Sequence, residues 1–263
     1  MLNWKNLDTL ASYQELEKTD RVNLVEVMSG ENGADRVKNY SIPMVEGLTY
    51  NYAAKAVDNQ VLEVLAKLAE EAQLVEKFES LYNGAVINTG EKRLVLHQLT
   101  RGQLGNKVEA DGVDKREFYV TQQKRIAEFA NKVHAGEITN AAGEKFTTVV
   151  QIGIGGSDLG PRAMYLALEN WAKKNNTFKM EAKFISNVDP DDAAAVLNSI
   201  DVAHSLFILV SKSGTTLETL TNESFVKDAL AKAGLDASRH MIAVTSETSP
   251  LAKSADYLAA FFM

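Results

Sequence analysis

The stretch "LFILVSKSGTTLETL", residues Leu206–Leu220, indicates the fold class because a strand signal and a helix signal meet within it. Its first five residues are all apolar and show no alternation with polar residues, which is typical of a strand buried on both faces. The apolar run stops at Ser-Lys-Ser-Gly-Thr-Thr, and a helical pattern follows from Thr215 to Ala233. The stretch therefore predicts a buried strand, a polar loop and a helix in direct succession, as in parallel α/β sheets.

Similar apolar segments recur along the second half of the chain, with helical patterns between them. The strand candidates are FTTVVQIGI ending near Ile154, Lys183–Ser186, SLFILV, Met241–Thr245 and YLAAFF. The helical patterns between them cover Pro161–Lys173, Pro190–Asn198 and Thr215–Ala233. This alternation predicts a parallel sheet covered by helices on both faces, in which ligands bind beyond the carboxyl ends of the strands.

The first half of the chain has a different pattern, mostly helical with loops. Its strongest helical signal is Val61–Leu81, where apolar residues mostly follow three-to-four spacing. We therefore expect residues 1–125 to form a mostly helical segment that packs on an α/β domain of residues 126–263.

Composition excludes several classes of function. The formal net charge is −7, from 28 Lys and Arg against 35 Asp and Glu, so nucleic acid is not expected as a partner. The chain has no cysteine, which excludes disulfides, thiolate metal sites and a cysteine nucleophile. No apolar run approaches the roughly 20 residues that span a bilayer, and the start lacks a signal-peptide pattern. These features predict a cytoplasmic protein without a membrane segment.

The loop of residues 211–216 has more polar groups than a helix cap requires. It contains four hydroxyls, one lysine and one glycine: Ser211, Lys212, Ser213, Gly214, Thr215 and Thr216. Gly214 can adopt a positive φ, and Thr215 with Glu218 matches a capping box. A helix N-terminus attracts anions, so the loop predicts a site for a phosphate dianion. The alternative is a well-capped helix with additional polar residues.

The loop after the first strand, GIGGSDLGPRA at 153–163, fails two nucleotide-binding motifs. Asp158 stands where the dinucleotide fingerprint needs its third glycine, and Pro161 stands where a P-loop needs lysine. A glycine-rich turn with one hydroxyl, Ser157, remains, and Pro161 suits the first turn of a helix. The alternative is a tight turn that needs glycine only for its backbone.

No acid–base pair or metal site emerges from the other polar residues. The four histidines, His97, His134, His204 and His240, lack metal-ligand spacing. His97 lies in an apolar segment and is interpreted as a packed side chain, whereas His204 and His240 precede strands, at the wrong end for a site. The aspartates after the second strand, Asp189, Asp191 and Asp192, are interpreted as helix caps.

Two long motifs resemble signatures of the glucose-6-phosphate isomerase family. They are "IGIGGSDLGP" and "VSKSGTTLET", and "LTYNYAAKAVDNQVLEVLAKLA", "EKRLVLHQLTR", "FISNVDPDD" and "IAVTS" resemble further segments of that family in the same order. The resemblance implies a sugar-isomerase domain with a five-stranded parallel, flavodoxin-like sheet and a helical N-terminal segment. It implies contacts with the sugar 6-phosphate from Gly156, Ser157, Ser211, Lys212, Ser213 and Thr216. Ser213 stands where many members have threonine, which keeps the hydroxyl.

The resemblance also implies an activity, which belongs to glycolysis and gluconeogenesis. Family members interconvert glucose 6-phosphate and fructose 6-phosphate through a cis-enediol(ate), as homodimers and without a metal or redox cofactor. The family's catalytic groups come from a later segment and a second sugar-isomerase domain, so we expect them beyond Met263. This chain would then be roughly the N-terminal half of the enzyme, able to bind sugar phosphates weakly but inactive alone.

Two other functions stay open from the sequence. One is a non-catalytic phosphosugar-sensing module, although the acidic balance does not suit the nucleic-acid-binding partner that such modules usually have. The other is a nicotinamide-dependent oxidoreductase, which the glycine-rich turn suggests and the missing third glycine opposes.

Overall fold

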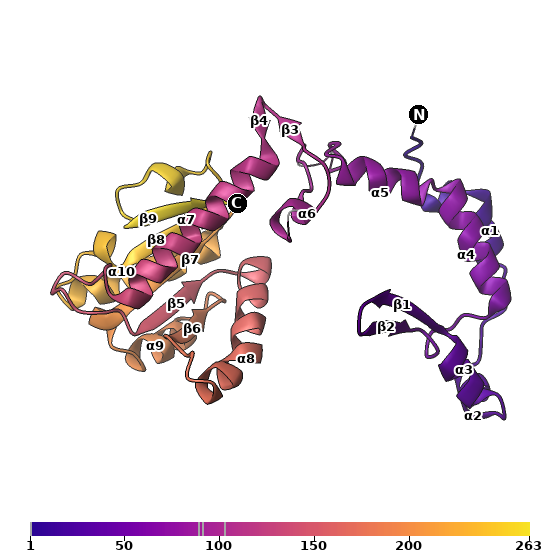
Figure 1. Cartoon of the computed structure of the whole chain (residues 1–263), viewed down its shortest axis with the longest axis horizontal. Helices are drawn as coiled ribbons and strands as arrows, with labels where there is room; N and C mark the ends of the chain where they lie inside the picture. The colour runs from indigo at the N-terminus through magenta and orange to yellow at the C-terminus, as the bar shows by residue number, and fades with distance from the viewer. Residues whose placement is uncertain (1, 89, 91, 103) are drawn as a thin grey trace. The chain divides into compact units, whose positions relative to one another are not determined.

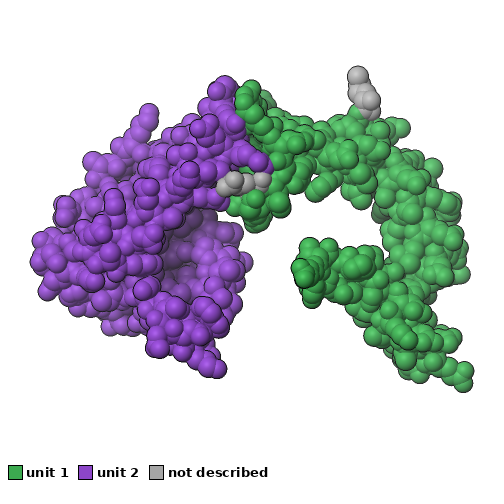
Figure 2. Space-filling view, viewed as in Figure 1, with its two compact units in different colours: residues 1–109 green, residues 110–263 purple. Residues whose placement is uncertain are grey.

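The computed structural model describes residues 2–88, 90, 92–102 and 104–263. The chain divides into two compact units, residues 1–109 and residues 110–263 (Figure 2). The prediction of separate domains at 1–125 and 126–263 stays a prediction, and the boundary that it places falls within a long helix, α7 (Lys115–Ala135). No helix in the described ranges is long and apolar enough to cross a membrane.

The second unit is built on a five-stranded parallel sheet (Figure 1). Its strands are β5 (Thr148–Ile152), β6 (Glu181–Ile185), β7 (Ser205–Val210), β8 (Met241–Thr245) and β9 (Ala259–Phe262). They lie in the order β6-β5-β7-β8-β9, and every neighbouring pair is parallel. This is the flavodoxin-like order, so the predicted α/β class with a five-stranded parallel sheet is confirmed.

Helices lie on both faces of this sheet, as the unbroken apolar strands predict. The helices are α7, α8 (Leu159–Lys174), α9 (Pro190–Asn198) and α10 (Leu217–Lys232). Side chains of α9 and α10 pack with Val150, Phe207 and Leu209 in the larger core cluster, whereas α7 contributes Val133 to a second cluster on the other face. A two-stranded sheet of β3 (Glu109–Ala110) and β4 (Val113–Asp114) precedes α7. The connections of the larger sheet contain the short helices η2 (Gly155–Ser157), η3 (Val202–His204), η4 (Ala237–Arg239) and η5 (Pro250–Lys253).

Local caps explain where several helices begin. Asp189 accepts hydrogen bonds from the N–H groups of Asp191 and Asp192, and Pro190 occupies the first turn of α9. The interpretation as a helix cap is therefore confirmed for Asp189, whereas Asp191 and Asp192 lie within the first turn of α9. Asp114 caps α7 in the same way.

The first unit is mostly helical, but it also contains a hairpin. Its elements are η1 (Leu7–Thr9), α1 (Ala11–Leu16), α2 (Leu24–Ser29), α3 (Gly33–Asn39), β1 (Ser41–Val45), β2 (Leu48–Asn51), α4 (Asn59–Glu71), α5 (Leu74–Tyr82) and α6 (His97–Thr100). The prediction of one helix over Val61–Leu81 is wrong, because Gln73 adopts a left-handed φ of 53° between α4 and α5. The apolar spacing widens between Leu68 and Leu74, where the single helix fails.

Candidate functional site

The two polar loops singled out from the sequence begin at one edge of the sheet. Strands β5 and β7 are neighbours and pair in register, with Ile152 opposite Leu209 (Figure 1). The chain crosses from β5 outward to β6 and then back past β5 to β7. Their carboxyl ends therefore form the topological switch point, where ligands bind in doubly wound sheets.

A buried serine organises the loop after β7. The Ser211 side chain is buried, and its hydroxyl accepts a hydrogen bond from the N–H of Gly214 at 3.1 Å. The same hydroxyl donates to Oγ1 of Thr216 at 3.4 Å, and the Ser211 carbonyl accepts from the Thr245 hydroxyl at 2.7 Å. The hydrogen bonds of Ser211 therefore hold Gly214 and Thr216 in position and attach the loop to strand β8.

The outer part of the loop faces solvent. Lys212 and Ser213 are exposed, and Thr216 is half-buried. The Ser213 hydroxyl accepts from the N–H of Thr215 at 3.2 Å and from its hydroxyl at 3.0 Å. The carbonyl of Lys212 accepts from the N–H of Ser246 at 3.1 Å, which fixes the loop backbone against the loop after β8. A cationic side chain and two hydroxyls thus stand at the solvent side of the switch point.

The capping box predicted for Thr215 and Glu218 is wrong. The N-cap of α10 is Thr216, and its side chain makes no cap hydrogen bond, while the Thr215 hydroxyl is bonded to Ser213. The error arises because the helix begins two residues later than its sequence pattern suggests. The first N–H groups of α10 therefore lack a side-chain cap, and such groups form hydrogen bonds with anions in many proteins.

Gly214 is required by both its conformation and its surroundings. Its φ is +68°, and a Cβ atom there would lie 2.1 Å from Oγ of Ser249 and 3.0 Å from Cγ of Leu251. The expectation of a positive φ at this residue is confirmed. The glycine lets the loop pass close to η5 while its backbone turns into α10.

The loop after β5 is a tight turn fixed by a side chain of the strand itself. Gln151 Nε2 donates to the carbonyl of Ser157 at 2.8 Å, and a Cβ on Gly153 would lie 2.8 Å from that carbonyl oxygen. Gly155 has a φ of +55°, whereas a Cβ on Gly156 would meet no atom within 4 Å. Glycine is therefore needed at Gly153 because of the close carbonyl and at Gly155 because of the positive φ. Neither reason applies at Gly156, which leaves room for a ligand next to its backbone.

The acidic residue of this turn is already paired. Asp158 is buried, and its Oδ1 accepts from Nε of Arg162 at 3.1 Å and lies 3.0 Å from Nη2 of the same guanidinium. Ser157, next to it, is half-buried at the loop surface. This carboxylate therefore holds the start of α8 in place.

Two histidines of the second unit lie at the opposite end of the sheet from these loops. His204 and His240 precede β7 and β8 at the amino edge, as expected. His240 is fully buried, with Nδ1 3.1 Å from the Ser205 carbonyl. The interpretation of His97 as a packed side chain is wrong, because it is exposed at the start of α6 while its neighbours Leu96 and Leu99 are buried. Within the described ranges, no group of three His, Asp or Glu side chains could hold a metal ion.

Sequence reasoning missed three buried polar groups near the carboxyl edge. The side-chain oxygens Thr219 Oγ1, Asn222 Oδ1 and Ser246 Oγ are buried and have no hydrogen-bond partner among the residues that the structure describes. Asn222 Nδ2 donates to the carbonyl of Asn187 at 3.2 Å, which ties α10 to the loop after β6. One sequence signal was available: Ser246 directly follows the fourth predicted strand, as Ser211 follows the third.

The fold and its two switch-point loops define a doubly wound α/β domain of the kind that binds ligands at the carboxyl edge of its sheet. A family model described as phosphoglucose isomerase matches residues 51–255. The chain belongs to the phosphoglucose isomerase family.

Relatives of known name agree with this assignment. The chain is 58% identical to a glucose-6-phosphate isomerase of Treponema denticola, with all of this chain and 50% of the relative covered. It is 52% identical to the Treponema pallidum (strain Nichols) enzyme of the same name, with 100% of this chain and 50% of that protein covered. A crystal structure of a Chlamydia trachomatis glucose-6-phosphate isomerase matches with a TM-score of 0.80 and 35% identity, over 98% of this chain and 48% of that one. The chain thus spans about half the length of these relatives.

Proposed function

We propose that this chain supplies the phosphate-binding part of an enzyme that interconverts glucose 6-phosphate and fructose 6-phosphate. The observation that supports this most is the loop after β7, where an exposed lysine and hydroxyls precede a helix whose first N–H groups lack a side-chain cap. A phosphate dianion is the ligand for which this combination is suited. The named isomerases to which the chain is similar act on sugars with such a group.

Each loop residue has a proposed role. Ser213, Thr216 and Ser157 donate hydroxyl hydrogen bonds to the 6-phosphate, and the N–H of Gly156 adds a backbone donor. The Lys212 ammonium balances the charge of the dianion. Ser211 donates to the phosphate or to Thr216, and it keeps Gly214 in the conformation that turns the loop into the helix.

The phosphate is bound at a distance from C1 and C2, the carbon atoms that react. In the proposed isomerisation, a base removes the proton from C2 of the open-chain aldose and returns a proton to C1 through a cis-enediol(ate). Binding energy at the phosphate would hold C1 and C2 in place for that base. No metal or redox cofactor is needed, because the proton and electron balance closes within the sugar.

We further propose that this chain does not catalyse the reaction alone. Asp158 is paired with Arg162, and the resemblance assigns the catalytic groups to other parts of the family's polypeptide. The full-length protein would be a cytoplasmic homodimer. A general base must be held within hydrogen-bonding reach of the proton that it moves, and we assign that base to the half of the relatives' length that this chain does not span.

A coupled assay for conversion of fructose 6-phosphate to glucose 6-phosphate tests the missing base. The purified chain should show no turnover beyond that of matched preparations of Ser211→Ala and Lys212→Ala, which control for host enzyme. Turnover that disappears in both variants would mean that the catalytic groups lie within residues 1–263.

Thermal-shift runs separate the alternative functions. Fructose 6-phosphate should raise Tm, whereas NAD should not, because ligand binding to the folded state alone stabilises it. Stabilisation by NAD alone would favour an oxidoreductase. Sugar-phosphate binding that never supports turnover, even together with the remaining half of a relative, would favour a non-catalytic phosphosugar-binding module.

A further inference from the structure

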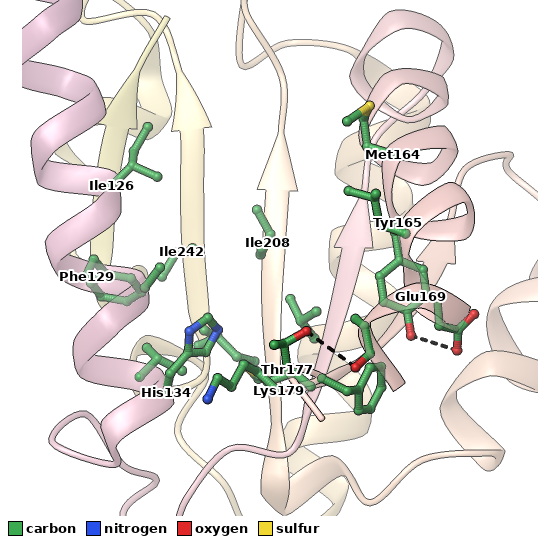
Figure 3. A pocket seen from close by; sticks show the side chains of 18 of the residues that line it. Ile126, Phe129, His134, Met164, Tyr165, Glu169, Thr177, Lys179, Ile208 and Ile242 are labelled. Carbon is green, nitrogen blue, oxygen red and sulfur yellow. Dashed lines mark hydrogen bonds between the residues drawn. The ribbon is translucent and has the colours of Figure 1, made fainter. Parts of the chain in front are cut away.

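An open apolar groove lies on the face of the sheet opposite α9 and α10. It runs between α7 and α8 and has a volume of about 530 Å³ (Figure 3). Its floor is made by Val149 of β5, Ile208 of β7 and Val244 of β8, with Phe129 of α7 and Leu168 of α8 on its walls. The groove is separate from the carboxyl-edge loops, since no residue of 153–158 or 211–216 lines it.

The floor of the groove is less buried than the other face of the same strands. Val149, Ile208 and Val244 are only half-buried, although they lie on the three inner strands of the sheet. Phe207 and Leu209, which alternate with Ile208 on β7, are completely buried beneath the opposite helices. Inner strands of a parallel sheet are normally covered on both faces, so a covering layer is missing over this part of the sheet.

Helix α8 also lacks a covering layer. None of its 16 residues is buried. Met164 and Leu168 face the groove with exposures of 62% and 50%, and Trp171 is 60% exposed. A surface helix of a globular protein normally buries an apolar stripe, and exposed apolar surface of this extent marks an interaction site.

Polar groups at the end of the groove are already engaged with one another. Tyr165 donates from its hydroxyl to Oε1 of Glu169 at 3.1 Å (Figure 3). Lys173, which does not line the groove, pairs with the same oxygen at 2.7 Å. Burial raises the pKa of Tyr165, so its hydroxyl stays protonated near neutral pH. Polar side chains of His134, Thr177 and Lys179 also line the groove, but most of the lining is apolar, which suits apolar side chains better than a charged ligand.

We infer that this groove is the docking surface for an apolar-faced segment from the half of the family's polypeptide that this chain does not span. The relatives have about as much chain again as the part that aligns here, which is ample to supply such a segment. The three inner strands span about 10 Å across the groove floor, close to the diameter of about 10–12 Å of one helix. The occupant that suits these dimensions is an amphipathic helix with its apolar side on Ile208.

The test uses the absence of cysteine in the chain, which makes any introduced thiol unique. Leu168→Cys places the thiol in the groove, and Leu166→Cys places it on the same helix outside the groove, where Leu166 is 61% exposed. Each variant is co-expressed with the half of the Treponema denticola isomerase that lies outside the aligned region. Maleimide labelling rates are then measured for the chain alone and for the co-purified complex.

We expect the two polypeptides to co-purify in a one-to-one ratio. In the complex, labelling at Leu168→Cys should slow at least tenfold, and labelling at Leu166→Cys should change less than twofold. Leu168→Glu should weaken the association at least tenfold, whereas Leu166→Glu should leave it within twofold. Leu168 is half-exposed, so its substitution should not unfold the chain.

Three results would overturn the inference. The first is a failure of the two polypeptides to co-purify. The second is a complex in which both thiols label at unchanged rates. The third is a slowing at Leu168→Cys that appears with rising concentration of this chain alone, which would make a second copy the occupant. None of these measurements involves a sugar phosphate, so they succeed or fail independently of the proposed function.

Discussion

At the scale of the residue, Gly214 shows how a backbone conformation and a close neighbour act at the same position. Gly214 and Gly234 both have left-handed φ values, +68° and +72°. A Cβ on Gly214 would collide with Oγ of Ser249, whereas a Cβ on Gly234 would meet nothing within 4 Å. Alanine substitutions at the two glycines therefore separate the free-energy cost of a left-handed φ from the free-energy cost of the collision with Ser249.

We predict that Gly214→Ala lowers the free energy of unfolding more than Gly234→Ala does. The left-handed conformation costs an alanine about 1–2 kcal/mol in both variants. The collision should add about 1–3 kcal/mol at Gly214, as overpacking does elsewhere. Urea denaturation of the two variants measures the difference, and equal losses would contradict the proposed contact between the loop and Ser249.

At the scale of the element, the caps predicted from sequence are accurate where one side chain decides the helix start. Asp189 accepts from two N–H groups, whereas Asp191 lies in the first turn of α9, where a negative charge is favourable to the helix dipole. Asp189→Ala should lower the free energy of unfolding by about 1 kcal/mol, and Asp191→Ala by a few tenths. Urea denaturation of both variants checks this, and an Asp191→Ala loss as large as that of Asp189→Ala would refute the cap assignment.

A second element-scale feature is a histidine held between two carboxylates at the amino edge of the sheet. Nδ1 of His204 lies 2.8 Å from Oδ2 of Asp201, and Nε2 lies 3.1 Å from Oε2 of Glu144. The hydrogen bond to Asp201 raises the pKa of His204 above its usual range. When it is protonated, the imidazole pairs with both carboxylates and links η3 to the segment before β5.

This arrangement predicts a defined pH dependence. The pKa of His204 is raised in the folded state, so its stabilising effect is complete below about pH 6.5, the unfolded value. The effect declines as the pH rises through the folded pKa. The difference in unfolding free energy between the unsubstituted chain and His204→Gln should shrink from pH 6 to pH 9, as measured by urea denaturation. A constant difference for His204→Gln would contradict the ion-paired geometry.

The bounds of helices and strands were predictable from sequence where the local signals are strong. They were not predictable where tertiary packing determines the backbone conformation. The strand Met241–Thr245 and the helix Pro190–Asn198 match the structure residue for residue, because turn and cap residues bound them. The helix after β7 was placed two residues early, since Thr215 and Thr216 are equivalent candidates for a cap in sequence. The break at Gln73 was missed because glutamine favours helices and seldom adopts a positive φ.

At the scale of the whole molecule, the strand order places the two loops side by side, and that arrangement was predictable from strand alternation and the switch-point rule. The groove between α7 and α8 was not predictable, because half-burial of Ile208 depends on what covers the sheet. An apolar run looks the same whether its second face is covered by this chain or by another polypeptide.

Isothermal titration of the chain with fructose 6-phosphate tests the phosphate site, with fructose as the ligand that lacks the phosphate. We expect binding of the phosphate ester only. Lys212→Ala should weaken it about tenfold or more, since a charge-assisted hydrogen bond contributes about 1.5–3 kcal/mol. Lys232→Ala, at the other end of α10, should leave it unchanged. Equal binding of fructose, or affinity unchanged by Lys212→Ala, would contradict the assignment of the loop after β7 as the phosphate site.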